Sequence, residues 1–104
     1  KQLIRLLLGM HTEAPVLLQD RLTAVPFLPP GSSSLGRATA GALERFSAVI
    51  WPGHGMVAVG RSAAAALDII ELTEKAAQIA LNVGPGIGLS PAQQKSIRKA
   101  SGLE

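Results

Sequence analysis

Residues 48–51, Ala-Val-Ile-Trp, form an uninterrupted apolar run of strand length. Successive side chains of a strand point to opposite faces of its sheet, so a run that is apolar throughout needs cover on both faces. Gly53, His54 and Gly55 interrupt the run, and residues 56–60 resume strand character, which predicts an antiparallel neighbour with His54 at the turn. We therefore expect a central strand between two helical layers. The few helices of a 104-residue chain would not cover both faces of the sheet, so part of this cover should come from elsewhere.

The segments before this run predict short elements. Residues 1–8 carry a helical apolar stripe that stops at Gly9. The Val- and Leu-rich runs at residues 14–19 and 22–28 predict two strands, or a strand and an extended arm, and Pro26 should keep the second run at a sheet edge. The serines at 32–34 then predict the cap of a helix that ends near residue 46, with an inner face of Leu35, Ala38, Ala42 and Phe46.

Two helices are predicted after the run. The longer begins at an N-cap, Ser62, and continues to about Val83. The last begins at a capping box, Ser90-Pro91-Ala92-Gln93, and stops near Gly102. One side of the long helix is traced by Leu67, Ile70, Glu74, Ala77 and Leu81. Together the elements predict an α/β fold with a mixed sheet and helical layers, present here as an incomplete fragment.

Charge and composition exclude several classes of protein. The net charge is +3 and the basic residues are dispersed, so the densest group, Lys95, Arg98 and Lys99, indicates a solvated helix face and no nucleic-acid partner. The absence of cysteine excludes disulfides and thiolate metal sites and fits the cytoplasm. No stretch approaches the ~20 apolar residues of a membrane span. Because the sequence does not begin with methionine, we expect a trimmed product of a longer chain.

His54 is the residue that most directly indicates chemistry. Flanking glycines leave its imidazole accessible, and neutral imidazole is a common zinc donor. The alternative is a turn histidine that is hydrogen-bonded to backbone. A catalytic zinc ion takes three protein ligands, and the only other histidine, His11, lies far upstream in an unrelated segment. Glu13 lies in a predicted loop, where a carboxylate is more commonly a solvated charge or a helix-end neighbour than a catalytic group.

Residues 25–32, 49–55 and 70–78, taken in order, resemble the class II aldolase family, and the element Trp-Pro-x-His-Gly is the most specific part of the likeness. The resemblance covers nearly the whole chain. It implies a three-layer α/β/α sandwich with a mixed, largely antiparallel sheet. Residues 1–104 would then be the C-terminal portion of a single class II aldolase-like domain.

The same resemblance implies a site and a reaction. His54 matches the third ligand of a zinc ion, or another divalent metal, whose other two ligands belong to an HxH motif upstream of this chain. Glu13 matches a catalytic glutamate that reaches the site of a neighbouring subunit in a homotetramer. The implied reaction is aldol cleavage or condensation of a sugar phosphate through the enediolate of dihydroxyacetone phosphate. Gly53 stands where a bulkier residue is common, and the segment around Met10 and His11 matches less closely.

Two other functions fit the same scaffold. One is a pentulose-phosphate 4-epimerase, and the other is a non-catalytic protein of binding or assembly, as adducin-like head domains are. The HxH motif upstream of this chain would separate the enzymes from the non-catalytic class. Because a single imidazole cannot supply a three-ligand site, we expect the isolated 104 residues to hold zinc poorly and to be inactive.

Overall fold

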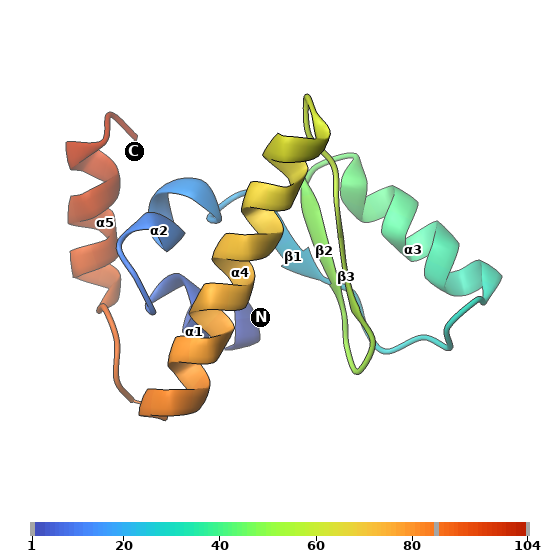
Figure 1. Ribbon diagram of the computed structural model, residues 1–104, viewed down its shortest axis with the longest axis horizontal. Helices are drawn as coiled ribbons and strands as arrows, with labels where there is room; N and C mark the ends of the chain where they lie inside the picture. Colours follow the sequence, from blue (N-terminus) through green and yellow to red (C-terminus); the bar gives the residue numbers. More distant parts are fainter. Residues whose placement is uncertain (1, 85, 104) are drawn as a thin grey trace. The chain divides into compact units, whose positions relative to one another are not determined.

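The computed structural model describes residues 2–84 and 86–103 and divides into two compact units (Figure 1). The first unit, unit 1, runs to Gln19 and resumes at Glu71, and the second, unit 2, is Asp20–Ile70. Helix α4 (Ala63–Val83) begins in unit 2 and continues into unit 1. Each unit has its own buried residues and is described by itself.

Unit 2 is built on a three-stranded mixed sheet of β1 (Leu22–Ala24), β2 (Ala48–Trp51) and β3 (Gly55–Ala58), in the order β1-β2-β3. β1 pairs with β2 in parallel, and β2 pairs with β3 in antiparallel register. The prediction that the apolar run is the central strand, with an antiparallel partner after the His54 turn, is confirmed. The mixed character of the sheet is confirmed as well.

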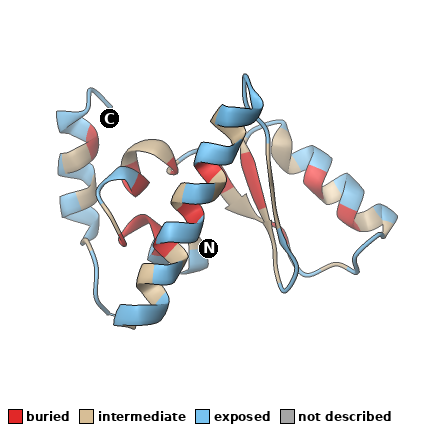
Figure 2. Ribbon diagram, in the orientation of Figure 1, coloured by how far each residue is buried: buried red, intermediate tan, exposed pale blue. Residues whose placement is uncertain are grey.

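Helix α3 (Ser33–Leu43) connects the parallel strands β1 and β2. Ser32 is its N-cap, because the Ser32 hydroxyl accepts a hydrogen bond from the Leu35 amide at 3.1 Å. The helix ends three residues before the predicted Phe46. The core of unit 2 consists of Val25, Leu35 and Val49, and Figure 2 shows buried positions on both α3 and the sheet.

Strand β1 is shorter than the predicted run at residues 22–28. The Val25 amide still donates to Ile50 O at 3.2 Å, but Pro26 has no N–H with which to continue the ladder. The strand therefore ends at Ala24. The prediction that Pro26 keeps this segment at a sheet edge is confirmed, since β1 is the first strand in the sheet order.

Unit 1 is helical and contains α1 (Gln2–Leu8), α2 (Glu13–Leu17), the later turns of α4 and α5 (Pro91–Ala100). The predicted capping box is present at the start of α5, where the Ser90 hydroxyl accepts from Gln93 N and the Gln93 side chain accepts from Ser90 N. The loop before α5 packs against the end of α1, because Leu89 N donates to Gly9 O at 2.7 Å. A Cβ on Gly88 would lie 2.8 Å from Gly9 O, so this glycine permits the close approach.

The prediction of a strand at residues 14–19 is wrong, since Glu13–Leu17 is helix α2. Ala14 and Leu18 are fully buried four residues apart, which is a helical spacing rather than the alternation of a strand. Pro15 falls in the first turn, where the backbone N–H has no partner within the helix, so proline is tolerated there. Glu13 is therefore the first residue of a helix and does not lie in a loop.

The side of α4 that the sequence traced is not the side that is buried. The buried positions are Ile69, Thr73 and Ala76, whereas Leu67 is half exposed and Leu81 is 85% exposed. Glu74 consequently lies on the exposed side, where its carboxylate accepts a hydrogen bond from Gln78 at 3.1 Å. The helix presents two apolar sides, and the described part of the chain covers only one of them.

Arg98 corrects the expectation of a solvated basic face on α5. Its side chain is 8% exposed, and one guanidinium N–H donates to Pro15 O at 2.8 Å. Lys95 and Lys99 are exposed, as predicted. The guanidinium therefore joins α5 to α2 within unit 1.

Replacing Arg98 with methionine is expected to destabilise the intact protein by ~1–3 kcal/mol, because the Pro15 carbonyl loses a charged donor in a buried place while most of the aliphatic stem is kept. Urea denaturation followed by far-UV circular dichroism measures the change. Lys99→Met is the matched control and should leave the midpoint nearly unchanged, since Lys99 is exposed. Equal midpoints for the two variants would contradict the structural role of Arg98.

No helix among residues 2–84 and 86–103 combines the length and the apolar character needed to cross a bilayer.

Candidate functional site

The turn that carries His54 is encoded by two adjacent residues, Pro52 and Gly53. Proline has the φ required at the second position of a type II turn, and Gly53 has the positive φ, 73°, required at the third. The turn is closed by a hydrogen bond from His54 N to Trp51 O at 3.0 Å. Trp51 and His54 thus occupy the first and last positions of one β-turn between β2 and β3. The glycine that departs from the family pattern at position 53 suits this backbone conformation.

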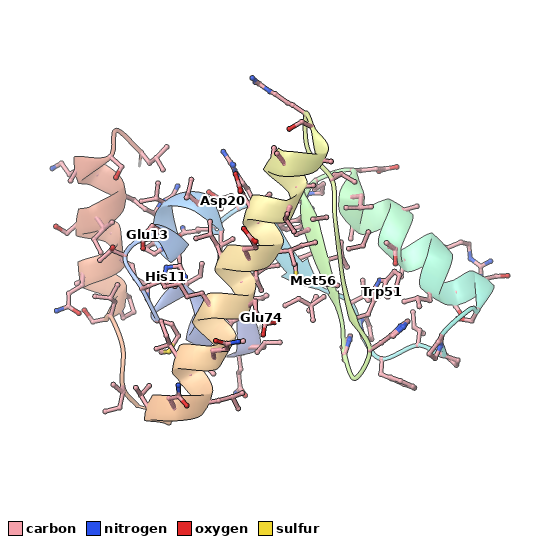
Figure 3. All side chains as sticks on the ribbon, viewed as in Figure 1. His11, Glu13, Asp20, Trp51, Met56 and Glu74 are labelled. Carbon is pink, nitrogen blue, oxygen red and sulfur yellow. The ribbon has the colours of Figure 1, made fainter. Side chains whose placement is uncertain are left out.

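The side chains of Trp51 and His54 stack on each other. Their ring centroids lie 5.2 Å apart and their planes are inclined by 26°. The indole is also held by its N–H group. Trp51 Nε1 donates to the hydroxyl of Thr39 at 3.0 Å, and that hydroxyl donates to Leu35 O at 2.7 Å. Trp51, labelled in Figure 3, lies between the hairpin and α3.

The imidazole of His54 is exposed at the tip of the hairpin. Within the described residues neither of its ring nitrogens makes a hydrogen bond, and its ring contact is the stack on Trp51. A groove of about 420 Å³ runs along α3 and has Trp51 in its lining, whereas His54 lies outside that lining. The predicted alternative, a turn histidine hydrogen-bonded to backbone through its ring, does not describe His54.

That alternative describes His11 instead. His11 Nδ1 accepts the Ala14 amide at 3.0 Å, and Nε2 lies 3.1 Å from Leu72 O, to which it donates. The side chain is 7% exposed. With Nδ1 accepting from an amide, that nitrogen carries no proton, so its 3.4 Å approach to Glu13 Oε1 is not a hydrogen bond in this tautomer. The ring caps the start of α2 and joins it to α4 inside unit 1.

Glu13 is exposed at the first position of α2, close to His11 (Figure 3). Its side chain is 54% exposed. A hydrogen bond from its own backbone N–H lowers the pKa of the carboxyl below the ordinary value of 4.5, and the positive charge of the nearby Lys75 lowers that pKa further. Glu13 is therefore ionised at neutral pH and can accept a proton or a hydrogen bond, but it is poorly suited to donate a proton.

The described residues do not form a complete metal site by themselves. No group of three or more His, Asp or Glu side chains among residues 2–84 and 86–103 is arranged to hold a metal ion. His54 offers one exposed imidazole whose ring nitrogens make no hydrogen bond within the described residues, which fits a single zinc ligand. His11 is committed to backbone partners, and Glu13 belongs to the other unit from His54.

Residues 2–81 match the family described as the class II aldolase and adducin N-terminal domain. The chain belongs to this family. The predicted resemblance to class II aldolases, drawn from the segments around Phe27, His54 and Glu74, is therefore confirmed. The match includes both His54 and Glu13, and it ends within α4.

Several curated relatives are rhamnulose-1-phosphate aldolases. The enzyme of Enterococcus faecalis is 37% identical over 76% of this chain and 28% of its own length. That of Listeria monocytogenes serotype 4b is 30% identical over the whole of this chain and 40% of its own length. That of Pectobacterium atrosepticum is 36% identical over 69% of this chain and 26% of its own. The chain thus spans well under half of the length of these relatives.

Sequence reasoning identified His54 but missed the residues that hold it. Thr39 and Trp51 contribute no group that coordinates a metal, so no ligand motif includes them. A signal was nevertheless present, since Pro-Gly between Trp51 and His54 predicts a tight turn that brings the two rings together. The Thr39 contact comes from a separate helix, and it depends on how α3 packs against β2.

Proposed function

We propose that the intact protein, of which this chain forms the C-terminal portion, is a zinc-dependent class II aldolase that cleaves or forms a sugar phosphate. The observation that supports this most strongly is His54, an exposed imidazole in a chain that belongs to the class II aldolase and adducin family. Rhamnulose 1-phosphate is the substrate that we propose first, because curated relatives carry that name.

His54 acts in this proposal as a metal ligand and not as an acid or a base. Its lone pair is available at either ring nitrogen, and the turn fixes the backbone on both sides of the residue. The remaining ligands come from the upstream part of the intact protein. The zinc ion, when bound, supplies a Lewis acid that polarises substrate oxygens and stabilises developing negative charge.

Glu13 handles a proton on the aldehyde side of the substrate. Its lowered pKa keeps the carboxylate ionised, so it can accept a hydrogen bond from a substrate hydroxyl and receive that proton as the carbonyl forms during cleavage. We propose that it does so in the site of a neighbouring subunit. This arrangement requires an oligomer, and a homotetramer is the assembly that the family resemblance implies.

The whole domain, in this proposal, is a three-layer α/β/α sandwich completed by the upstream segment. The support is the apolar surface that the described residues leave uncovered. Leu67 and Leu81 lie on the uncovered side of α4, and Phe27 follows the edge strand β1. Large apolar side chains are exposed at Leu3, Leu6, Phe27, Val59, Leu67, Leu81, Val83, Ile87 and Leu103. Further layers or further subunits would bury such side chains.

Activity measured on the intact protein tests the proposal. Purified protein should release dihydroxyacetone phosphate from rhamnulose 1-phosphate, should stop doing so after treatment with a strong chelator, and should recover when zinc is added. Epimerisation of a pentulose 5-phosphate without cleavage would establish the epimerase alternative. Failure of both reactions with zinc absent from the folded protein would favour the non-catalytic alternative, which the adducin branch of the family represents.

A further inference from the structure

The ring of a metal-bound histidine is usually oriented by a hydrogen bond from its second nitrogen to a carboxylate, a carbonyl or water. Within the described residues His54 makes no such bond, and an aromatic ring lies against it instead. The centroid separation of 5.2 Å falls in the range of favourable aromatic pairs. The position of His54 is therefore supported by a ring face.

Trp51 is itself held in place by a chain of hydrogen bonds. The Thr39 hydroxyl gives its hydrogen to Leu35 O at 2.7 Å, so its oxygen is left to accept the indole N–H at 3.0 Å. Thr39 is buried, and Leu35 belongs to the core of unit 2. The orientation of the indole is thus fixed by helix α3, and the imidazole of His54 stacks on that indole.

We propose that Trp51 is a positioning residue for His54, held in turn by Thr39, and that the indole–imidazole stack sets the affinity of the site for zinc. The inference rests on the proposed ligand role of His54. Coordination withdraws electron density from the imidazole, and an electron-poor ring is attracted more strongly to the π face of an indole. The stack therefore stabilises the metal-bound form of the ligand more than the free form.

The test uses zinc affinity of the intact protein, measured by competition with a chromophoric chelator. Thr39→Val keeps the shape of the side chain and removes the acceptor of the indole N–H. We expect it to weaken zinc binding about threefold to tenfold, the range that loss of an aromatic pair produces. Thr39→Ser restores the hydroxyl and should bind zinc within about twofold of the wild type. Trp51→Leu removes the ring face and should weaken binding at least as much as Thr39→Val.

Thr23→Val, in strand β1, is the matched control for a threonine-to-valine change in unit 2 and should leave zinc affinity unchanged. A second readout is fluorescence of Trp51, taken as the wild-type signal minus that of Trp51→Phe. Saturating Co²⁺ should quench this signal strongly in the wild type and less in Thr39→Val, because the indole is then no longer held against the metal-bound ring. Quenching at saturation does not depend on affinity or on small losses of stability.

The outcomes separate the two proposals. Wild-type zinc affinity in both Thr39→Val and Trp51→Leu, together with wild-type quenching in Thr39→Val, would overturn the positioning role, provided that His54→Ala loses zinc. Weakened binding in Thr39→Ser equal to that in Thr39→Val would also overturn it, since the hydroxyl would then be irrelevant. If His54→Ala keeps its zinc, the ligand assignment itself fails and the positioning role fails with it.

Discussion

The intact protein with His54 replaced by alanine is expected to purify with little or no zinc and to lose activity by on the order of 10³-fold or more. The reason is that metal-ion catalysis contributes several kcal/mol and a three-ligand site that loses one ligand no longer retains the ion. Zinc content per protomer, measured by mass spectrometry of metals, and the rate of dihydroxyacetone phosphate release are the two readouts. The fold should survive, because His54 is exposed at a turn.

The matched control is the other histidine. His11→Asn should keep zinc and lose stability, since both nitrogens of His11 are engaged with backbone groups of unit 1. Equal zinc content in the wild type and His54→Ala would contradict the ligand role. Zinc loss in His11→Asn at a temperature where that variant is folded would show that the assignment of the two histidines is reversed.

Glu13→Gln is expected to lower activity by on the order of 10²-fold while zinc content stays at the wild-type level, because positioned proton transfer contributes about that much. The carboxylate is exposed, so the loss should appear in kcat rather than in the thermal midpoint. The pKa of Glu13 is lowered below 4.5, so the wild-type carboxylate is charged at neutral pH and the variant should show its whole loss of activity there. The deficit should shrink only as the pH falls through that lowered pKa, where the wild type loses its charge.

Mixing the two inactive proteins tests whether Glu13 acts across subunits. If each site combines His54 of one subunit with Glu13 of its neighbour, random co-assembly of His54→Ala and Glu13→Gln subunits restores about a quarter of the sites. Co-expression with two affinity tags provides such mixed oligomers. Absence of any restored activity in verified mixed oligomers would show that Glu13 serves the site of its own subunit or none. Glu74→Gln, which changes another exposed glutamate, is the control for charge loss.

Local sequence signals predicted the centre of unit 2 well. The apolar run at residues 48–51, the glycine-flanked turn at His54 and the strand after it depend on contacts between near neighbours. Ser32 and Ser90 correctly predicted the starts of α3 and α5 for the same reason, since an N-cap forms its hydrogen bond within three residues.

The errors lie where distant parts of the chain decide the outcome. Over the six residues 14–19, alternation and helical spacing cannot be separated, and the helix there is favoured by a cap that His11 provides. On α4 both sides are apolar, so the sequence could not specify which one the described residues bury. Arg98 has the sequence pattern of a surface cation, because its partner, the Pro15 carbonyl, lies far away in the sequence and is brought to it only by the fold.

For the candidate site, the sequence proposed His54 as a metal donor and did not predict what surrounds it. Glycines beside His54 indicated accessibility, and the exposed ring agrees with this. The stack and the Thr39 hydrogen bond come from side-chain packing between β2 and α3, which no motif encodes. The roles of His54 and Glu13 remain proposals that the variants above test.

The turn at Pro52 and Gly53 also bears on the order of events during assembly of the site. Trp51 and His54 are three positions apart, so bringing their rings together closes only a very short loop and costs little chain entropy. A hairpin of this kind forms in ~1–10 μs, long before distant segments meet. The two rings thus meet early, and Thr39 fixes the indole once α3 packs against β2. In the proposed zinc site, the entropy lost in ordering the imidazole is therefore lost during folding and does not reduce the free energy of metal binding.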